Sequence, residues 1–319
     1  MAKSYYTAGR RRRAQAPSFT LKLDYDIGHC LEMSAQLPSA TPSALRTGLL
    51  SLDVALGGGL PAGVSEIYGP DSSGKTAVLG QALASAQQAG LDAALISSEY
   101  LDIPYLAQLG VDLDKLYVVR PHTDALMSSD VEEFAVGFCQ CPGTVLAIDS
   151  LTAHRHLFQD DAEWGFMVFK LLQILAHEVS FESWVLATSQ VRTRYEKGRP
   201  TAKLKSASDK FTDLFSASIE LSRAEVHEDS YTLVADIKSN TLARPGRVVE
   251  LPAIKGFGVD RAKDMLQLLV AWEIATQSGP WFSVAGTSLG PGFDAAGEAL
   301  MSGGLFDQLY NEVLLHVSP

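Results

Sequence analysis

Short apolar runs alternate with segments of helical periodicity through most of the chain. Seven runs have the aliphatic, β-branched composition of buried strands: VSEIY, AALIS, LYVV, TVLAID, SWVLAT, ASIEL and TLVADI. Between them, AVLGQALASAQQAG favours a helix that stops at Gly90, and residues 162–179 have apolar residues at i, i+3 and i+4. This alternation predicts an α/β fold with a largely parallel central sheet.

The pattern changes towards both ends of the chain. Residues 1–44 are irregular and contain proline, which predicts an N-terminal arm and linker before a main domain over residues 45–252. Beyond this domain, RAKDMLQLLVAWEIA favours a helix and GPWFSVAGTSLGPG a hairpin, and two helical segments are broken at Gly303 and Gly304. Residues 253–319 are therefore predicted to form a small C-terminal α+β domain.

Composition limits the partners of the protein. The chain has 319 residues with a formal net charge of −11, so its surface as a whole should repel nucleic acid and membranes, and any polyanion site must be local. Cys30, Cys139 and Cys141 lack the spacing of a disulfide framework, which indicates a reducing, cytoplasmic location. The CQC pair is more typical of ordinary packing than of a zinc site. No apolar stretch reaches membrane-spanning length, so no membrane partner is expected.

Two short segments carry weaker signals. The arginine run at residues 10–13 resembles the basic start of a signal sequence, but no apolar segment follows it. It is expected to be a solvated tail, with a DNA-contacting arm as the alternative. The triplet HRH at residues 154–156 could bind a metal ion, although a third ligand is missing from the pattern.

Residues 69–76 read GPDSSGKT, which has the spacing of a phosphate-binding loop. A predicted strand precedes the loop and a predicted helix follows it, so the helix N-terminus would add partial positive charge to an anion site. Backbone N–H groups of the turn would surround the phosphates, and the lysine would reach the β and γ phosphates. The predicted nucleotide-binding residues are Gly69, Pro70, Asp71, Ser72, Ser73, Gly74, Lys75 and Thr76.

Two carboxylates follow predicted strands. VLAIDS places Asp149 at the end of a buried strand, where it could hold Mg²⁺ together with the Thr76 hydroxyl, or could instead cap a helix. Glu99 follows AALIS and could act as the general base that polarises the water attacking the γ-phosphate. A glutamate in SSEY is also typical of the start of a helix.

A strongly basic segment covers residues 192–210. It has seven basic residues against two acidic ones, a local net charge of +5, and Gly198 and Pro200 favour a flexible loop. Such a loop could clamp the phosphate backbone of DNA, with a solvated charged loop as the alternative. The predicted DNA-binding residues are Arg192, Arg194, Lys197, Arg199, Lys203, Lys205 and Lys210.

The order of these motifs resembles that of the bacterial RecA recombinase family. The similar runs, from about residue 45 to the end, are LRTGLLSLDVALGGGLPAGVSEIYGPDSSGKT, SSEYLDIPYLAQLGVDLDKLYVVRP, VLAIDS, ATSQVR, GFGVDRAKDMLQLLV and GPWFSVAG. The resemblance implies a RecA-type P-loop ATPase core that uses ATP and Mg²⁺. It also implies that Glu99 is the catalytic carboxylate, that Asp149 holds the metal through water, that Asp102 and Tyr105 contact adenine, and that Gln190 senses the γ-phosphate.

One implied catalytic position departs from the family pattern. Lys238 would reach the γ-phosphate of a neighbouring subunit, but the second lysine that the family has two residues later is Asn240 here. Loss of a cation can raise the barrier to phosphoryl transfer, and Arg244 and Arg247 lie near enough in sequence to substitute.

The resemblance implies an ATP-dependent recombinase that forms filaments on single-stranded DNA and pairs it with double-stranded DNA. One alternative is a RecA-like mediator or regulator that binds ATP and a partner without strand exchange. The change at Asn240 and a segment between Asp149 and Gln190 that is shorter than in typical RecA proteins favour this alternative. The other is a hexameric, ring-forming DNA motor.

Overall fold

The structure is a computed structural model. It describes residues 44–120, 129–152, 161–179, 182–196, 199–205, 211–302 and 304–317.

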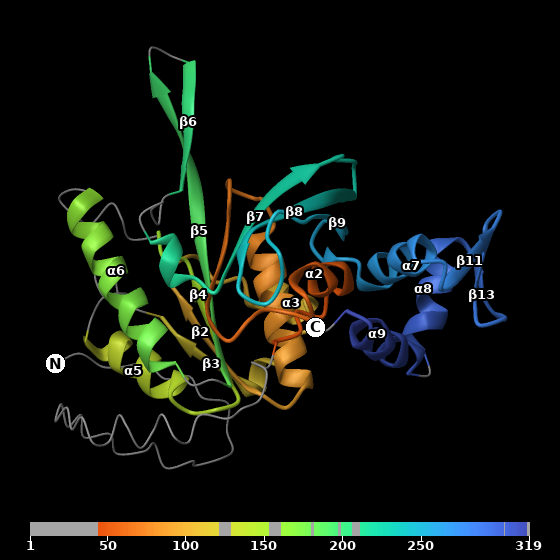
Figure 1. The fold of residues 1–319 in the computed structure, drawn as a ribbon, viewed down its shortest axis with the longest axis horizontal. Coiled ribbons are helices and arrows are strands. Elements are labelled where there is room, and N and C mark those ends of the chain that lie inside the picture. The colour runs from red at the N-terminus through yellow and green to blue at the C-terminus, as the bar shows by residue number, and fades with distance from the viewer. Residues whose placement is uncertain are drawn as a thin grey trace.

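A ten-stranded sheet forms the centre of the molecule (Figure 1). Its order is β10-β9-β8-β7-β1-β5-β4-β2-β3, and β6 pairs with β5 outside this path. Neighbours from β7 to β3 are parallel, whereas β8, β9 and β10 extend the sheet in antiparallel fashion. The predicted, largely parallel α/β sheet is therefore confirmed. The strand bounds are β1 (Gly63–Gly69), β2 (Asp92–Ser97), β3 (Leu116–Val119), β4 (Thr144–Asp149), β5 (Ser183–Glu196), β6 (Arg199–Lys205), β7 (Ala217–Ala224), β8 (Ser230–Asn240), β9 (Val248–Ile254) and β10 (Gly258–Val259).

Helices cover both faces of the sheet. Alternate side chains of each buried strand enter opposite cores, as Leu95 and Ile96 of β2 do. One core includes residues of α2 (Leu50–Leu56) and α3 (Lys75–Gln88), and the other includes residues of α5 (Ser129–Cys139) and α6 (Asp161–Glu178). Each fully buried Leu or Ile contributes about 1.5–3 kcal/mol of transfer free energy, which explains why the parallel strands are continuous apolar runs.

The C-terminal segment forms a third core. It comprises α7 (Arg261–Ala271), β11 (Ala275–Ser278), β12 (Trp281–Val284), β13 (Thr287–Pro291), α8 (Gly292–Met301) and α9 (Leu305–Leu315). The predicted hairpin is β12 and β13, with β11 as a third antiparallel strand. The helix predicted to continue to Ala275 ends earlier, because Glu273 takes a left-handed φ of 61° and Ala275 starts β11. Leu50 of α2 belongs to this third core. Helix α2 therefore connects the C-terminal segment with the core of the sheet.

Distant residues hold both ends of the short helix α2. At its start, Leu49 makes no side-chain cap, and the Ser51 backbone N–H donates instead to Asp264 of α7 at 3.1 Å. At its end, Arg247 donates to two carbonyls of the last turn at 3.2 Å, and the Asn240 amide donates to the last carbonyl at 2.8 Å. These bonds satisfy backbone groups that a helix leaves open at its termini.

A buried carboxylate lies in the middle of α2. Both oxygens of Asp53 accept the Thr47 backbone N–H at 3.0 Å, one accepts the Thr47 hydroxyl at 2.8 Å, and the other accepts the Tyr310 hydroxyl of α9. Burial raises the pKa of Asp53 to about 7. Asp53 therefore joins the first and last helices of the described chain.

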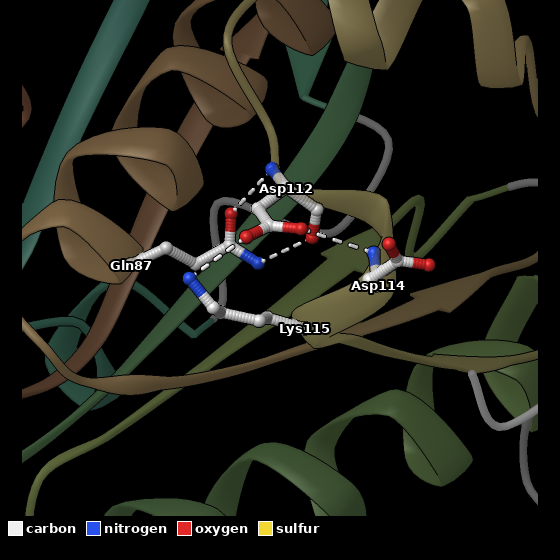
Figure 2. A network of polar contacts seen from close by, with 4 residues as sticks. All are labelled: Gln87, Asp112, Asp114 and Lys115. Carbon is white, nitrogen blue, oxygen red and sulfur yellow. Dashed lines mark hydrogen bonds and ion pairs between the residues drawn. The ribbon is translucent and has the colours of Figure 1, made fainter. Parts of the chain in front are cut away.

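A second polar network fixes the start of β3 (Figure 2). The side-chain amide of Gln87, near the end of α3, donates to the Asp112 carbonyl at 2.9 Å and accepts the Asp112 N–H at 2.8 Å. The Asp112 carboxylate accepts the Asp114 N–H at 3.1 Å and pairs with Lys115 at 2.8 Å. The ion pair is exposed and contributes little, so the amide pairing is the main link between α3 and β3.

Replacing Gln87 by Ala should lower the free energy of unfolding by about 1–2 kcal/mol, because both half-buried backbone groups of Asp112 lose their partner. Urea denaturation would measure the loss. Gln88→Ala is the matched control: Gln88 is the exposed neighbour, and its change should stay within about 0.5 kcal/mol. Equal losses in the two variants would contradict the role of Gln87.

The predicted flexible loop over residues 192–210 is wrong where the structure describes it. β5 continues to Glu196 and pairs in antiparallel fashion with β6, and the hairpin extends away from the rest of the sheet (Figure 1). The ladder gives both backbones hydrogen-bond partners that a loop would lack, and Pro200 is tolerated because β6 is an edge strand. Lys197 and Lys210 lie outside the described residues.

Cys139, the last residue of α5, is buried in the core, and burial raises the pKa of its thiol to about 12, whereas Cys141 is exposed. Within the described ranges, no group of three or more His, Cys, Asp or Glu side chains could hold a metal ion. Cys30, the arginine run at residues 10–13 and the HRH triplet at residues 154–156 lie outside those ranges. In the described part of the chain, no helix has both the length and the apolar character that crossing a membrane requires.

Candidate nucleotide-binding site

The sequence GPDSSGKT forms the turn between β1 and α3. Gly69 ends β1, and Gly74 caps α3 with a left-handed φ of 92°. A Cβ atom on Gly69 would lie 2.2 Å from the Leu221 carbonyl oxygen, and one on Gly74 would lie 2.6 Å from the Leu233 side chain. The loop thus packs directly on β7 and β8, and neither position has room for a side chain. Ser73 Oγ is buried in this turn without a hydrogen-bond partner among the described residues.

Lys75, the first residue of α3, lies over the loop. Its Nζ donates to the carbonyls of Gly69 at 3.1 Å and Pro70 at 2.8 Å. Burial lowers the pKa of the lysine, and three carboxylates oppose this shift: Asp71, Glu99 and Asp149. The ammonium group therefore lies among the acidic groups of the site, next to the turn that would hold the phosphates.

Thr76 and Asp149 come together as the sequence predicts. Asp149 ends β4, and its two oxygens accept hydrogen bonds from the hydroxyls of Thr76 at 3.1 Å and Thr188 at 2.5 Å. The two threonines orient the carboxylate towards the start of α3. A hydroxyl and a carboxylate are hard oxygen donors of the kind Mg²⁺ prefers, so these residues fit that ion.

Glu99 follows β2 by two residues and is half-buried. Its Oε1 accepts the Ser150 hydroxyl at 2.5 Å and lies 3.5 Å from the side-chain nitrogen of Gln190. Gln190 is on β5 and pairs in register with Gly69 of the loop. The carboxylate, the amide and the loop therefore meet at the same edge of the sheet.

The two residues matched to adenine contact lie close to each other. Asp102 caps α4 (Ile103–Gln108), and its Oδ1 accepts the Tyr105 N–H at 3.0 Å. Burial raises the pKa of the Tyr105 hydroxyl to about 12, and the neighbouring Tyr231 adds to this rise. Both phenol rings pack against the core that contains α3.

Lys238 is not brought to the loop of its own chain. It lies on β8 an odd number of residues from Leu233, which contacts Gly74, and side chains at odd separations point to opposite faces of a sheet. Its ammonium pairs with Glu220 at 3.2 Å and with Asp236. Asn240 and Arg247 are engaged with α2, as described above, and Arg244 is exposed.

Two further residues of the site, Ser150 and Thr188, were not predicted from the sequence. They hold the two carboxylates of the site in place. The sequence did contain a signal for them: VLAIDS and SWVLAT are apolar strands that end in a hydroxyl residue. Such a residue is fully buried here, and a buried hydroxyl needs a nearby hydrogen-bond partner.

Sequence comparisons agree with this fold. The family described as the RecA N-terminal domain matches residues 22–153, and so begins within the segment predicted to be an arm. Protein RecA of Rhodospirillum centenum is 32% identical over 292 residues, covering 84% of this chain and 79% of that protein. Protein RecA of Crocosphaera subtropica is 32% identical over 79% of this chain and 76% of its own length. Protein RecA of Paenarthrobacter aurescens is 33% identical over 78% of this chain and 76% of its own length. With this similarity along most of both chains, the protein is a divergent member of the RecA family.

Proposed function

We propose that the protein is an ATP-dependent DNA recombinase that assembles on single-stranded DNA and pairs it with double-stranded DNA. One observation carries the proposal: Gln190 lies on the strand that pairs with the phosphate loop and continues directly into the basic hairpin. A nucleotide-dependent contact at Gln190 would thus act on the segment best suited to bind a DNA backbone. The family membership supports the same assignment.

The residues of the loop have distinct roles in the proposed reaction. Backbone N–H groups of residues 69–76 and the Lys75 ammonium would bind the phosphates of ATP, while Thr76 and Asp149 would hold Mg²⁺, which neutralises phosphate charge when bound. Glu99 would accept a proton from the attacking water, and Ser150 would orient it. Gln190, within 3.5 Å of Glu99, would connect the state of the γ-phosphate to β5.

The hairpin is proposed to bind DNA electrostatically. Arg192, Arg194, Arg199, Lys203 and Lys205 recur at alternate positions along β5 and β6, in a chain whose net charge is −11. Contacts to phosphates release counterions, so affinity for single-stranded DNA should fall steeply as salt rises.

The second candidate is a mediator that binds ATP without strand exchange. The residues expected to supply positive charge to a neighbouring subunit favour this candidate. Lys238 is held in ion pairs, Asn240 replaces the second lysine, and Arg247, which could have substituted for it, is bonded to α2 together with Asn240. A chain with fewer free cations to offer a neighbouring γ-phosphate would hydrolyse ATP slowly.

The test is ATP hydrolysis with and without single-stranded DNA, using wild type and Lys75→Ala. DNA stimulation that disappears in Lys75→Ala would support a DNA-dependent ATPase, and a D-loop assay would then separate recombinase from mediator. Electron micrographs would distinguish a helical filament from the ring of a hexameric motor. ATP binding without DNA-stimulated turnover would contradict the recombinase and favour the mediator.

A further inference from the structure

An arginine and a tyrosine lie on the face of the sheet that packs against the phosphate loop. Leu221 of β7 and Leu233 of β8 contact the loop glycines. Arg223 lies two residues beyond Leu221, and Tyr231 lies two residues before Leu233, so both share the face of these leucines. In the ladder Arg223 pairs with Leu233, the residue that contacts Gly74, and Tyr231 lies two residues away along β8.

The guanidinium of Arg223 stacks on the ring of Tyr231. Its Cζ lies 4.2 Å from the centroid of the Tyr231 ring. The ring is buried whereas the guanidinium is exposed, and in the part of the chain that the structure describes Arg223 has no ion pair. Stacking orients the guanidinium plane and leaves its N–H donors along the edge, where a ligand acceptor could bind.

The pair lies at the predicted base end of the site. Arg223 and Tyr231 are close enough to the Tyr105 hydroxyl to affect its pKa, Tyr231 raising it and Arg223 lowering it. Tyr105 follows Asp102 on α4, and these two are the residues proposed to contact adenine. Tyr231 belongs to the core that contains α3, and Tyr105 packs against that same core.

We propose that Arg223, held by Tyr231, binds the base-and-ribose end of the nucleotide and is an affinity-determining residue of the site. The assignment rests on the proposed function. A guanidinium only donates hydrogen bonds, and a purine nucleoside offers acceptors in its ring nitrogens and ribose oxygens. The phosphate end is already supplied with donors by the loop and Lys75. Arg223 should therefore matter for a whole nucleotide and not for its phosphates alone.

The experiment compares ATP with inorganic tripolyphosphate, which lacks base and ribose. Isothermal titration in the presence of Mg²⁺ would give both dissociation constants for wild type, Arg223→Ala, Lys75→Ala and the charge-matched control Lys170→Ala. Lys170 is exposed on α6, where it pairs with Glu132. Arg223→Ala should weaken ATP about tenfold, equivalent to about 1.4 kcal/mol, and leave tripolyphosphate within about twofold. Lys170→Ala should change neither.

Two results would overturn the assignment: unchanged ATP affinity in Arg223→Ala, or equal losses for ATP and tripolyphosphate, which would mean a general charge effect. Arg223→Lys keeps the charge without the planar fork and should recover only part of the ATP affinity; full recovery would also count against a stacked, directional contact. Failure of the proposed function is recognised separately, because wild type would then bind neither ligand or Lys75→Ala would bind both normally. Circular dichroism melting of each variant confirms that it is folded.

Discussion

Glu99→Gln is expected to slow ATP hydrolysis by about 100-fold or more while ATP affinity stays within a few-fold of wild type. Glutamine keeps the shape of the side chain and can still accept the Ser150 hydroxyl, but it cannot take a proton from water. The contact with Gln190 can also survive through the amide oxygen. Single-turnover hydrolysis with saturating single-stranded DNA, together with ATP titration, would separate the chemical step from binding.

Glu133→Gln is the matched control, because Glu133 is an exposed glutamate on α5. This variant should hydrolyse ATP at the wild-type rate. Turnover of Glu99→Gln within about threefold of wild type would refute Glu99 as the general base. A parallel loss of affinity and rate would instead assign the carboxylate to organising the loop.

Asp53→Ala is expected to lower the free energy of unfolding by about 3 kcal/mol or more. The change leaves three buried donors without their acceptor, the N–H and hydroxyl of Thr47 and the hydroxyl of Tyr310, and each unmatched group costs about 1–3 kcal/mol. It also removes the link between α2 and α9. Urea denaturation followed by circular dichroism would measure the loss, and a change below about 1 kcal/mol would contradict it.

The same carboxylate should make stability depend on pH. Its pKa is raised from 3.8 to about 7 in the folded protein, so the folded state binds the proton more tightly than the unfolded state. The resulting stabilisation is complete below about pH 4 and is lost as pH rises through 7, with a slope of up to about 1.4 kcal/mol per pH unit. Burial raises the pKa of Asp264 to about 6, which acts in the same direction.

Asp53→Asn removes the titrating group and keeps an oxygen that can accept from Thr47. Between pH 5 and pH 8 its stability should therefore fall less than that of wild type, and the remaining slope should come from Asp264. Denaturation curves at several pH values would test this, and parallel pH profiles for the two proteins would rule out Asp53 as the source.

The parallel sheet and the phosphate loop were predictable from local sequence. A strand buried on both faces must be apolar throughout, so runs such as TVLAID and SWVLAT are visible without any knowledge of their partners. The loop is equally local, because its turn, its lysine and the following helix N-terminus lie within eight consecutive residues.

The features that were not predicted depend on contacts between distant residues. Asp53 and Asp264 look like ordinary surface charges, yet their partners Tyr310 and Ser51 are 257 and 213 residues away. Asn240 was interpreted only as a missing lysine, whereas its amide caps a helix 184 residues earlier. The hairpin had a local signal, basic residues at alternate positions, but Gly198 and Pro200 favoured a loop.

The continuity of β5 gives the hairpin a mechanical property. Six residues separate Gln190 from Glu196, which at about 3.3 Å per residue puts the end of the strand roughly 20 Å from the edge of the sheet. Because β5 and β6 are paired along their length, a tilt of about 10° where the hairpin leaves the sheet would displace its end by roughly 3 Å. A small rearrangement around the Gln190 amide would thus be amplified into a larger displacement at the end of the hairpin.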